Sequence, residues 1–181
     1  MEQESIFYHV VTDRPMELHQ RILFDESHHS GVWQRVMDKL PVVEEIYANP
    51  AAYRDVTLEH HTDVALRELA LEEVRQAEYP HYPSRMACLY VSRSLKEAED
   101  WFDFFTRIGR PTYQIVKLRV RGNVFEGDAV KCFDGTPDHE ESLRMARRYW
   151  ANRPEDDEER RVVELLADGE LEVIEIVKSI L

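Results

Sequence analysis

The sequence predicts an α+β fold, a mixed or antiparallel sheet with helices inserted between its strands. Two kinds of pattern carry the prediction. Residues 112–120, TYQIVKLRV, alternate Val116, Leu118 and Val120 with charged residues, as a half-buried strand does. Residues 62–78 instead repeat apolar side chains at helical spacing. Short segments of both kinds follow one another along the chain.

The first part of the chain predicts two strands and a divided helix. Residues 6–11, IFYHVV, form a short strand pattern that ends at Asp13-Arg14-Pro15, and residues 21–25 form a second. Helical spacing then runs through residues 31–48. Pro41 is expected to kink or split this segment, because proline lacks the N–H that an inner helical turn uses.

The middle of the chain predicts a helix, a rigid connector, and a strand that leads directly into another helix. The helix from Thr62 ends near Glu78, since the prolines of residues 79–84 remove donors and restrict their neighbours. The apolar run LYV, residues 89–91, precedes a capping box formed by Ser94 and Glu97, which marks the start of the next helix. The apolar stripe of that helix comprises Leu95, Ala98, Trp101, Phe102 and Phe105.

The last part of the chain predicts a short extended piece at residues 123–129, a helix at 139–151 and a charged loop at 153–161. The remaining residues predict a hairpin, RVVELLA-DG-ELEVIEIV. Asp168-Gly169 suits a two-residue type I′ turn between its strands.

Length and composition favour one domain, residues 1–181, with a sizeable core. Hydrophobic residues make up 43% of the chain and aromatic residues 10%. The formal net charge of −13 argues against general binding to duplex nucleic acid, which needs clustered Lys and Arg. Solubility explains the acidity most simply, although a local basic pocket for a small anion and a basic protein partner both stay open.

The cysteines and the first residues indicate a cytoplasmic protein without a membrane anchor. Cys88 and Cys132 belong to no C-x-x-C pair, so a zinc site or a disulfide framework is not expected. The first residues lack a basic start and a long apolar stretch, so no secretory signal is predicted. No apolar segment approaches the roughly 18–20 residues that span a bilayer.

Several common catalytic motifs are absent. The glycines form neither G-x-G-x-x-G nor a Walker loop, and neither G-x-S-x-G nor H-E-x-x-H occurs. Two histidine pairs, His28-His29 and His60-His61, are conspicuous. Adjacent residues project in different directions, so a pair alone rarely chelates a metal, and no metal site is predicted, although Glu59 and Asp63 beside His60-His61 leave that alternative open.

The order of the segments resembles the ADP-ribosyltransferase fold, in particular the diphtheria-toxin-like branch that includes the poly(ADP-ribose) polymerases. The sequence is more similar still to a bacterial family of unknown function that is grouped with that fold. The resemblance lies in F-Y-H-V-V, Y-P-x-x-P-S-R-M-x-C-L-Y-V-S-x-S-L-x-E-A-E-x-W, Y-Q-I-V-K-L-R-V-x-G and A-x-x-Y-W. It implies a split, mixed or antiparallel sheet with inserted helices, and NAD as substrate.

The resemblance also implies roles for individual residues. His9 falls where the family's first motif has a histidine that hydrogen-bonds the adenosine ribose of NAD. Tyr90 falls on the aromatic residue of the second motif, followed by the small polar Ser92. Trp101, eleven residues after Tyr90, falls where many members stack a tyrosine on nicotinamide. Tryptophan can still stack there, although it lacks the phenol. Each residue could instead be an ordinary part of the core or sheet.

Glu164 falls where the third motif has its catalytic glutamate. Cleavage of the nicotinamide–ribose bond creates an oxocarbenium-like ribose, which a nearby carboxylate stabilises. The same carboxylate can orient the sugar and help activate the nucleophile. Neighbouring glutamates that could take this position are Glu158, Glu159, Glu170 and Glu172. Arg85 is expected either to bind the pyrophosphate of NAD or to pair with a structural carboxylate.

The resemblance therefore implies an NAD-dependent ADP-ribosyltransferase, with a toxin or phage-defence role by analogy. The acceptor could be a protein, a nucleic acid or a small molecule. One alternative is a non-catalytic nucleotide- or protein-binding domain of the same fold, and another is an interaction protein with a basic partner. A nucleic-acid acceptor would require a local basic patch, for which the candidates are Arg107, Arg110, Arg119 and Arg121.

Overall fold

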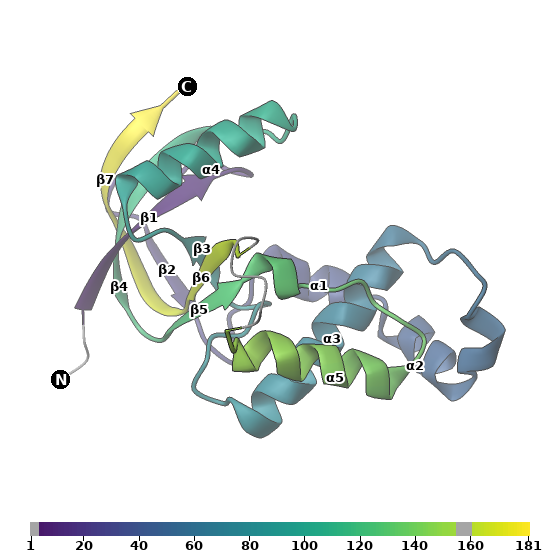
Figure 1. Cartoon of the computed structure of the whole chain (residues 1–181). Helices are drawn as coiled ribbons and strands as arrows, with labels where there is room; N and C mark the ends of the chain where they lie inside the picture. The colour runs from purple at the N-terminus through teal and green to yellow at the C-terminus, as the bar shows by residue number, and fades with distance from the viewer. Residues whose placement is uncertain (1–3, 155–160) are drawn as a thin grey trace.

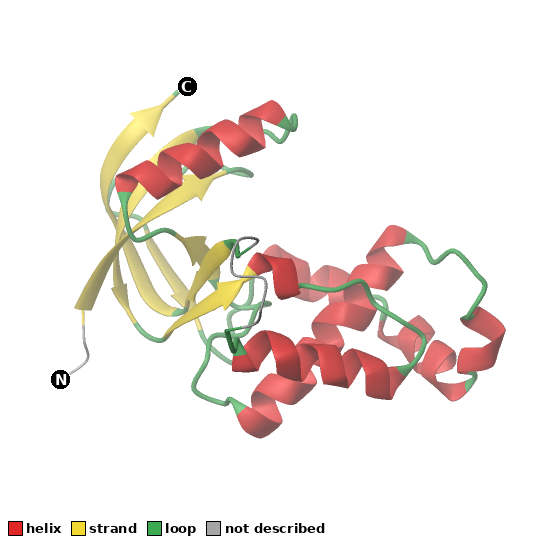
Figure 2. Ribbon diagram, viewed as in Figure 1, coloured by secondary structure: helices red, strands yellow, loops and turns green. Residues whose placement is uncertain are grey.

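The computed structural model describes residues 4–154 and 161–181. These residues form an α+β architecture with antiparallel sheets, as predicted. The strands gather at one side with helix α4 (Leu95–Arg107) lying across them, and other helices gather at the opposite side (Figure 1). Figure 2 shows the same division by type of secondary structure. Among the described residues, no helix has the length and apolar character needed to cross a membrane.

The strands of the described residues form two antiparallel sheets. Sheet A has the order β1-β4-β7-β2, and sheet B has the order β3-β6-β5. The strand bounds are β1 Glu4–Val11, β2 Arg21–Phe24, β3 Leu89–Val91, β4 Gln114–Arg121, β5 Val124–Asp128, β6 Val163–Ala167 and β7 Gly169–Ser179. Val116, Leu118 and Val120 of β4 are all buried, so the predicted alternation of this strand is confirmed.

The predicted C-terminal hairpin is wrong. β6 belongs to sheet B and β7 to sheet A, so the chain crosses between the sheets at Asp168 instead of folding back on itself. The link from β4 to β5 makes the same crossing at Gly122, and an added Cβ there would lie 2.2 Å from the Asp168 carbonyl oxygen. A type I′ turn needs positive φ at both central residues, and of Asp168 and Gly169 only the glycine has it, at +81°. The Asp-Gly pair therefore marks a close crossing of two segments of the chain, the β6–β7 link and the β4–β5 link.

The helices begin and end close to the predicted residues. Their bounds are α1 Gly31–Met37, α2 Leu40–Ala48, α3 His60–Glu78, α4 Leu95–Arg107 and α5 His139–Ala151, with short 3₁₀ turns at Pro50–Tyr53 and Ala129–Lys131. Pro41 stands in the first turn of α2, which explains why the 31–48 segment divides. Ser94 caps α4 by accepting a hydrogen bond from the Glu97 amide (3.2 Å), as the capping box predicts.

Apolar side chains fill the spaces between successive layers. Leu118 and Leu165 belong to the cluster between the two sheets. Leu166 and Trp150 belong to the cluster between sheet B and the helices α3 and α5. Phe102 packs α4 against sheet A. β6 lies between β3 and β5 in sheet B and contributes to two of these clusters, so a charged residue on it needs a partner.

One backbone pair ties β1 to β3 and so joins the two sheets. The Tyr8 amide donates to the Ser92 carbonyl (2.9 Å), and the Ser92 amide donates to the Tyr8 carbonyl (2.8 Å). The residues next to this pair are His9 on one strand and Tyr90 and Val91 on the other. The pair thereby brings the first strand of the chain to the strand that precedes α4.

Candidate functional site

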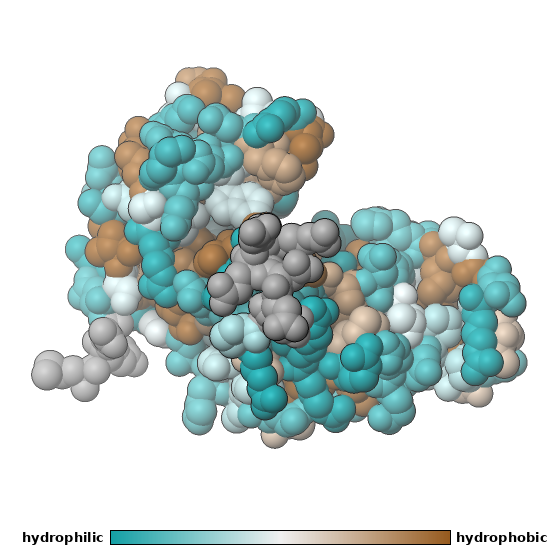
Figure 3. Space-filling model, in the orientation of Figure 1, coloured by the Kyte–Doolittle hydropathy of each residue, from teal (hydrophilic) through white to brown (hydrophobic). Residues whose placement is uncertain are grey.

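A cleft of about 320 Å³ opens where β1, β3, β6 and α4 meet, and we call it the narrow cleft. Five residues singled out in the sequence line it together: His9, Tyr90, Ser92, Trp101 and Glu164. They come from three parts of the chain. Some eighty residues separate His9 from Tyr90, and more than sixty separate Trp101 from Glu164. Figure 3 shows the surface hollowed between the strand-rich part that carries α4 and the helical part.

His9 offers one ring nitrogen to the cleft. Its Nδ1 lies 2.7 Å from the Tyr90 carbonyl oxygen, which can only accept, so Nδ1 carries the proton and donates. Burial lowers the pKa of His9 from its ordinary value, and the Arg110 charge lowers it further, against the opposing effect of the Tyr90 carbonyl. A neutral His9 with a protonated Nδ1 has Nε2 as a hydrogen-bond acceptor.

Aromatic side chains form the apolar wall of the narrow cleft. Trp101 lies on α4 with its ring centroid 5.5 Å from that of Phe105 and 5.8 Å from that of Phe104, which holds the indole in place. Tyr90 is 44% exposed although it lies on a strand between the partly buried Leu89 and the buried Val91. Tyr90 and Trp101 therefore line the same cleft, one from a strand and the other from a helix.

Arg110 is a residue of the cleft that the sequence argument did not place there. It follows α4, its guanidinium lies 4.8 Å from the centre of the Phe105 ring, and its Nη2 donates to Thr12 Oγ1 (3.0 Å). The signal that could have found it is its position just after the helix that carries Trp101. Arg110 adds a positive charge to the lining of the narrow cleft.

Glu164 is held in one orientation by two donors. Arg85 Nη1 (2.8 Å) and the Tyr149 hydroxyl (2.5 Å) both donate to Oε1 of the carboxylate. The side chain is 12% exposed, so it is reachable from the cleft although β6 is a central strand. Burial is the main cause that raises the pKa of Tyr149, which therefore stays a phenol and donates.

Arg85 is not placed to bind a pyrophosphate, and the prediction that it binds the cofactor is corrected here. It is buried, and its Nε donates to Glu68 (3.0 Å) while its Nη1 donates to Tyr149 and Glu164. Its Nη2 faces Glu68 and Cys132 Sγ. The N–H donors of the guanidinium are thus all used inside the protein. This agrees with the alternative expectation for Arg85, that it pairs with a structural carboxylate.

Other predicted features lie apart from the narrow cleft. Arg119 and Arg121 pair with Glu4 on sheet A, whereas Arg110 lines the cleft, so the predicted basic patch is divided. Within residues 4–154 and 161–181, no group of three or more His, Cys, Asp and Glu side chains could hold a metal ion. Glu158 and Glu159, two alternatives to Glu164, lie outside the described residues. Glu170 and Glu172, the other two alternatives, line a groove on sheet A with Arg21 and Arg119.

The sequence model of the family DUF2441, described as a protein of unknown function, matches residues 7–179. The match covers nearly the whole chain, so the chain belongs to this family. No curated protein matches it.

Proposed function

We propose that this protein is an NAD-dependent ADP-ribosyltransferase with an ADP-ribosyltransferase-like fold. The observation that carries the proposal is that His9, Trp101 and Glu164, which the resemblance connects with NAD, line one cleft of about 320 Å³. That volume falls at the small end of the range for ligand pockets, roughly 300–1,000 Å³, and suits the nicotinamide riboside end of the molecule.

The aromatic residues of the narrow cleft would hold the nicotinamide ring. Tyr90 and Trp101 offer flat faces on different elements, and a charged pyridinium ring stacks favourably on the electron-rich face of an aromatic side chain. Tryptophan supplies a larger face than the tyrosine of many family members. The neutral His9 would accept a hydrogen bond at Nε2 from a ribose hydroxyl.

Glu164 would act at the ribose. In the reaction the C1′–nitrogen bond of the nicotinamide riboside breaks, and its electron pair leaves with neutral nicotinamide. The oxocarbenium-like ribose that develops is stabilised by the carboxylate, and the acceptor's nucleophile then bonds to C1′ and gives its proton to the Glu164 carboxylate or to water. Arg85 and Tyr149 both donate to Oε1, an arrangement that orients the carboxylate before the substrate arrives.

A binding module of the same fold is the second candidate. Its support is that Glu164 is hydrogen-bonded to the buried Arg85 and Tyr149. A glutamate with a purely structural role would make the same contacts. Such a module would bind NAD or a related nucleotide in the same cleft without breaking the glycosidic bond. The acidic surface also allows a basic protein partner.

The test is the incubation of the purified chain with a cell lysate and with NAD labelled in its adenine half. Transfer of label to an acceptor and release of nicotinamide are both measured. We expect Glu164→Gln to lower both by about 10²-fold or more, the loss typical when a group that stabilises charge in the transition state is removed. The matched control is Glu170→Gln, an exposed strand glutamate on sheet A, which should keep wild-type rates.

The outcomes separate the candidates. Wild-type turnover in Glu164→Gln would reject Glu164 as the catalytic carboxylate. Thermal stabilisation by NAD without turnover in the unaltered chain would favour the binding module, and no stabilisation would favour the interaction protein. Unfolding midpoints of the variants show whether a loss of activity reflects chemistry or the fold.

A further inference from the structure

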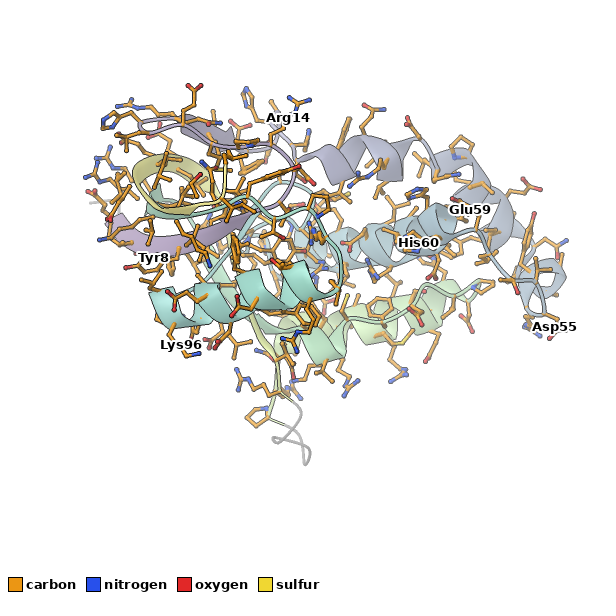
Figure 4. All side chains as sticks on the ribbon, turned by 90° about the horizontal axis from the view of Figure 1, so that it is seen from above. Tyr8, Arg14, Asp55, Glu59, His60 and Lys96 are labelled. Carbon is orange, nitrogen blue, oxygen red and sulfur yellow. The ribbon has the colours of Figure 1, made fainter. Side chains whose placement is uncertain are left out.

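A second hollow of about 1,210 Å³ continues from the narrow cleft, and we call it the wide cleft. His9, Thr12, Tyr90 and Arg110 line both, so a ligand can extend from one into the other without a break. The wide cleft runs along the loop after β1 and reaches the loop before α1 and the first turns of that helix. Arg14, in the loop after β1, lies near the start of α1 (Figure 4).

The wide cleft is basic in an acidic protein. Its lining carries five arginines against two carboxylates, Asp13 and Glu68, whereas the whole chain has a formal charge of −13. Arg67 and Arg85 are committed to Glu68. Arg14 and Arg35 form no ion pair with any carboxylate of residues 4–154 and 161–181. Uncompensated guanidinium groups along a cleft attract a phosphorylated ligand and suit bidentate contacts with it.

An aromatic stack lies at the α1 end of the wide cleft. The rings of His29 and Trp33 are 4.3 Å apart and within 8° of parallel. Trp33 belongs partly to the helical core, and His29 is exposed and lines the cleft. Because Trp33 covers one face of the imidazole, the other face or the ring edge is what His29 offers to a ligand. A flat ring held by packing is a suitable surface for a nucleobase.

We propose that the wide cleft binds a nucleoside diphosphate unit, with its phosphates at Arg14, Arg35 and Arg110 and its base on His29. The proposal rests on the proposed function only in identifying this unit as the ADP half of NAD. A phosphate is disfavoured beside the Glu164 carboxylate, since like charges repel, and Arg14 and Arg35 line the wide cleft but not the narrow one. The ligand is thereby oriented with its nicotinamide end at Trp101 and its anionic part among the arginines.

The experiment measures binding of ADP, adenosine and inorganic pyrophosphate by calorimetry, with no turnover required. We expect Arg14→Gln/Arg35→Gln to weaken ADP and pyrophosphate by about tenfold or more and to spare adenosine, since hydrogen bonds to charged groups are worth about one such factor. His29→Ala should weaken ADP and adenosine and spare pyrophosphate. His29→Phe, which keeps a flat ring, should restore ADP binding.

The control is Arg54→Gln, which removes the same charge from an exposed position at the end of a 3₁₀ turn outside both clefts. Equal ADP affinity in the unaltered chain and in both cleft variants would overturn the proposal, as would the absence of ADP binding to the unaltered chain. Cleft-dependent ADP binding in a chain that never turns over NAD would support this site and reject the enzyme. Turnover of NAD with a KM that the cleft variants leave unchanged would support the enzyme and reject this site.

Discussion

His9 has one ring nitrogen committed to the protein and one left for a ligand. The sequence placed a histidine on the first strand, but the tautomer follows from the Tyr90 carbonyl 2.7 Å from Nδ1, some eighty residues away along the chain. Glu164 is likewise defined by contacts: Arg85 and Tyr149 turn an ordinary strand glutamate into an oriented carboxylate. At the scale of the residue, the sequence could name His9 and Glu164 as candidates. The residues that contact them in the fold decided the tautomer of His9 and the orientation of Glu164.

The lowered pKa of His9 predicts how stability depends on pH. Burial, the main cause, makes the folded pKa lower than that of the unfolded chain. The unfolded chain therefore binds more protons below its own pKa of about 6.5, so this contribution to the free energy of unfolding is present above about pH 6.5 and is lost as the pH falls toward the folded pKa. Urea unfolding between about pH 5 and pH 8 measures the effect.

His9→Gln should flatten that pH dependence, since glutamine does not titrate and can donate to the Tyr90 carbonyl. His81→Gln is the matched control, because His81 lies exposed in the connector after α3 and should leave the slope unchanged. A His9→Gln variant that loses stability on acidification as steeply as the unaltered chain would contradict the argument.

At the scale of the element, helices and strand alternation were predictable because their causes are local. Capping side chains, Pro41 and apolar periodicity all act within a few residues, and α5 begins and ends at the predicted residues 139 and 151. The pairing of β6 and β7 was not predictable in this way. A strand joins whichever sheet buries it best. An Asp-Gly pair is compatible both with a tight turn and with a crossing between sheets, so the pair does not tell the two apart.

The crossing at Gly169 makes a specific prediction for stability. Its φ of +81° disfavours a side chain, and an added Cβ would lie 2.3 Å from the Arg121 carbonyl oxygen. Gly169→Ala should therefore lower the free energy of unfolding by about 2–4 kcal/mol, measured with urea. Gly31→Ala, where a Cβ meets nothing within 4 Å, should change it by less than about 1 kcal/mol. If both substitutions lowered the free energy of unfolding equally, the close crossing at Gly169 could not be the cause of the loss.

At the scale of the whole molecule, Arg85 links layers that are otherwise held by apolar contacts. Its partners Glu68, Tyr149 and Glu164 lie on α3, α5 and β6, so one guanidinium connects the helical part to the central strand of sheet B. The candidate site is thereby tied to the packing of the helices. A substitution far from the narrow cleft can change the cleft through this residue.

Removing Arg85 should be costly because it leaves two carboxylates without their buried partner. Arg85→Met is expected to lower the free energy of unfolding by about 3–5 kcal/mol. Arg93→Met is the control, since its pair with Glu126 is surface-exposed and worth about 0–1 kcal/mol. Adding Glu164→Gln to Arg85→Met should restore part of the loss, a non-additivity that a double-mutant cycle measures. Strict additivity would show that the pair is not coupled.

The amino-acid sequence by itself determined the α+β class, the order of the helices and most strands, and His9, Tyr90, Ser92, Trp101 and Glu164 as candidates. Those features depend on local periodicity, on capping, or on short motifs. The tertiary structure alone decided which sheet β6 and β7 join, that Arg85 is a buried partner of Glu164, and that Arg14, Arg35 and Arg110 line one cleft. The physical reason is that charge pairing and concavity arise between residues distant along the chain, and no local pattern records which of them will meet.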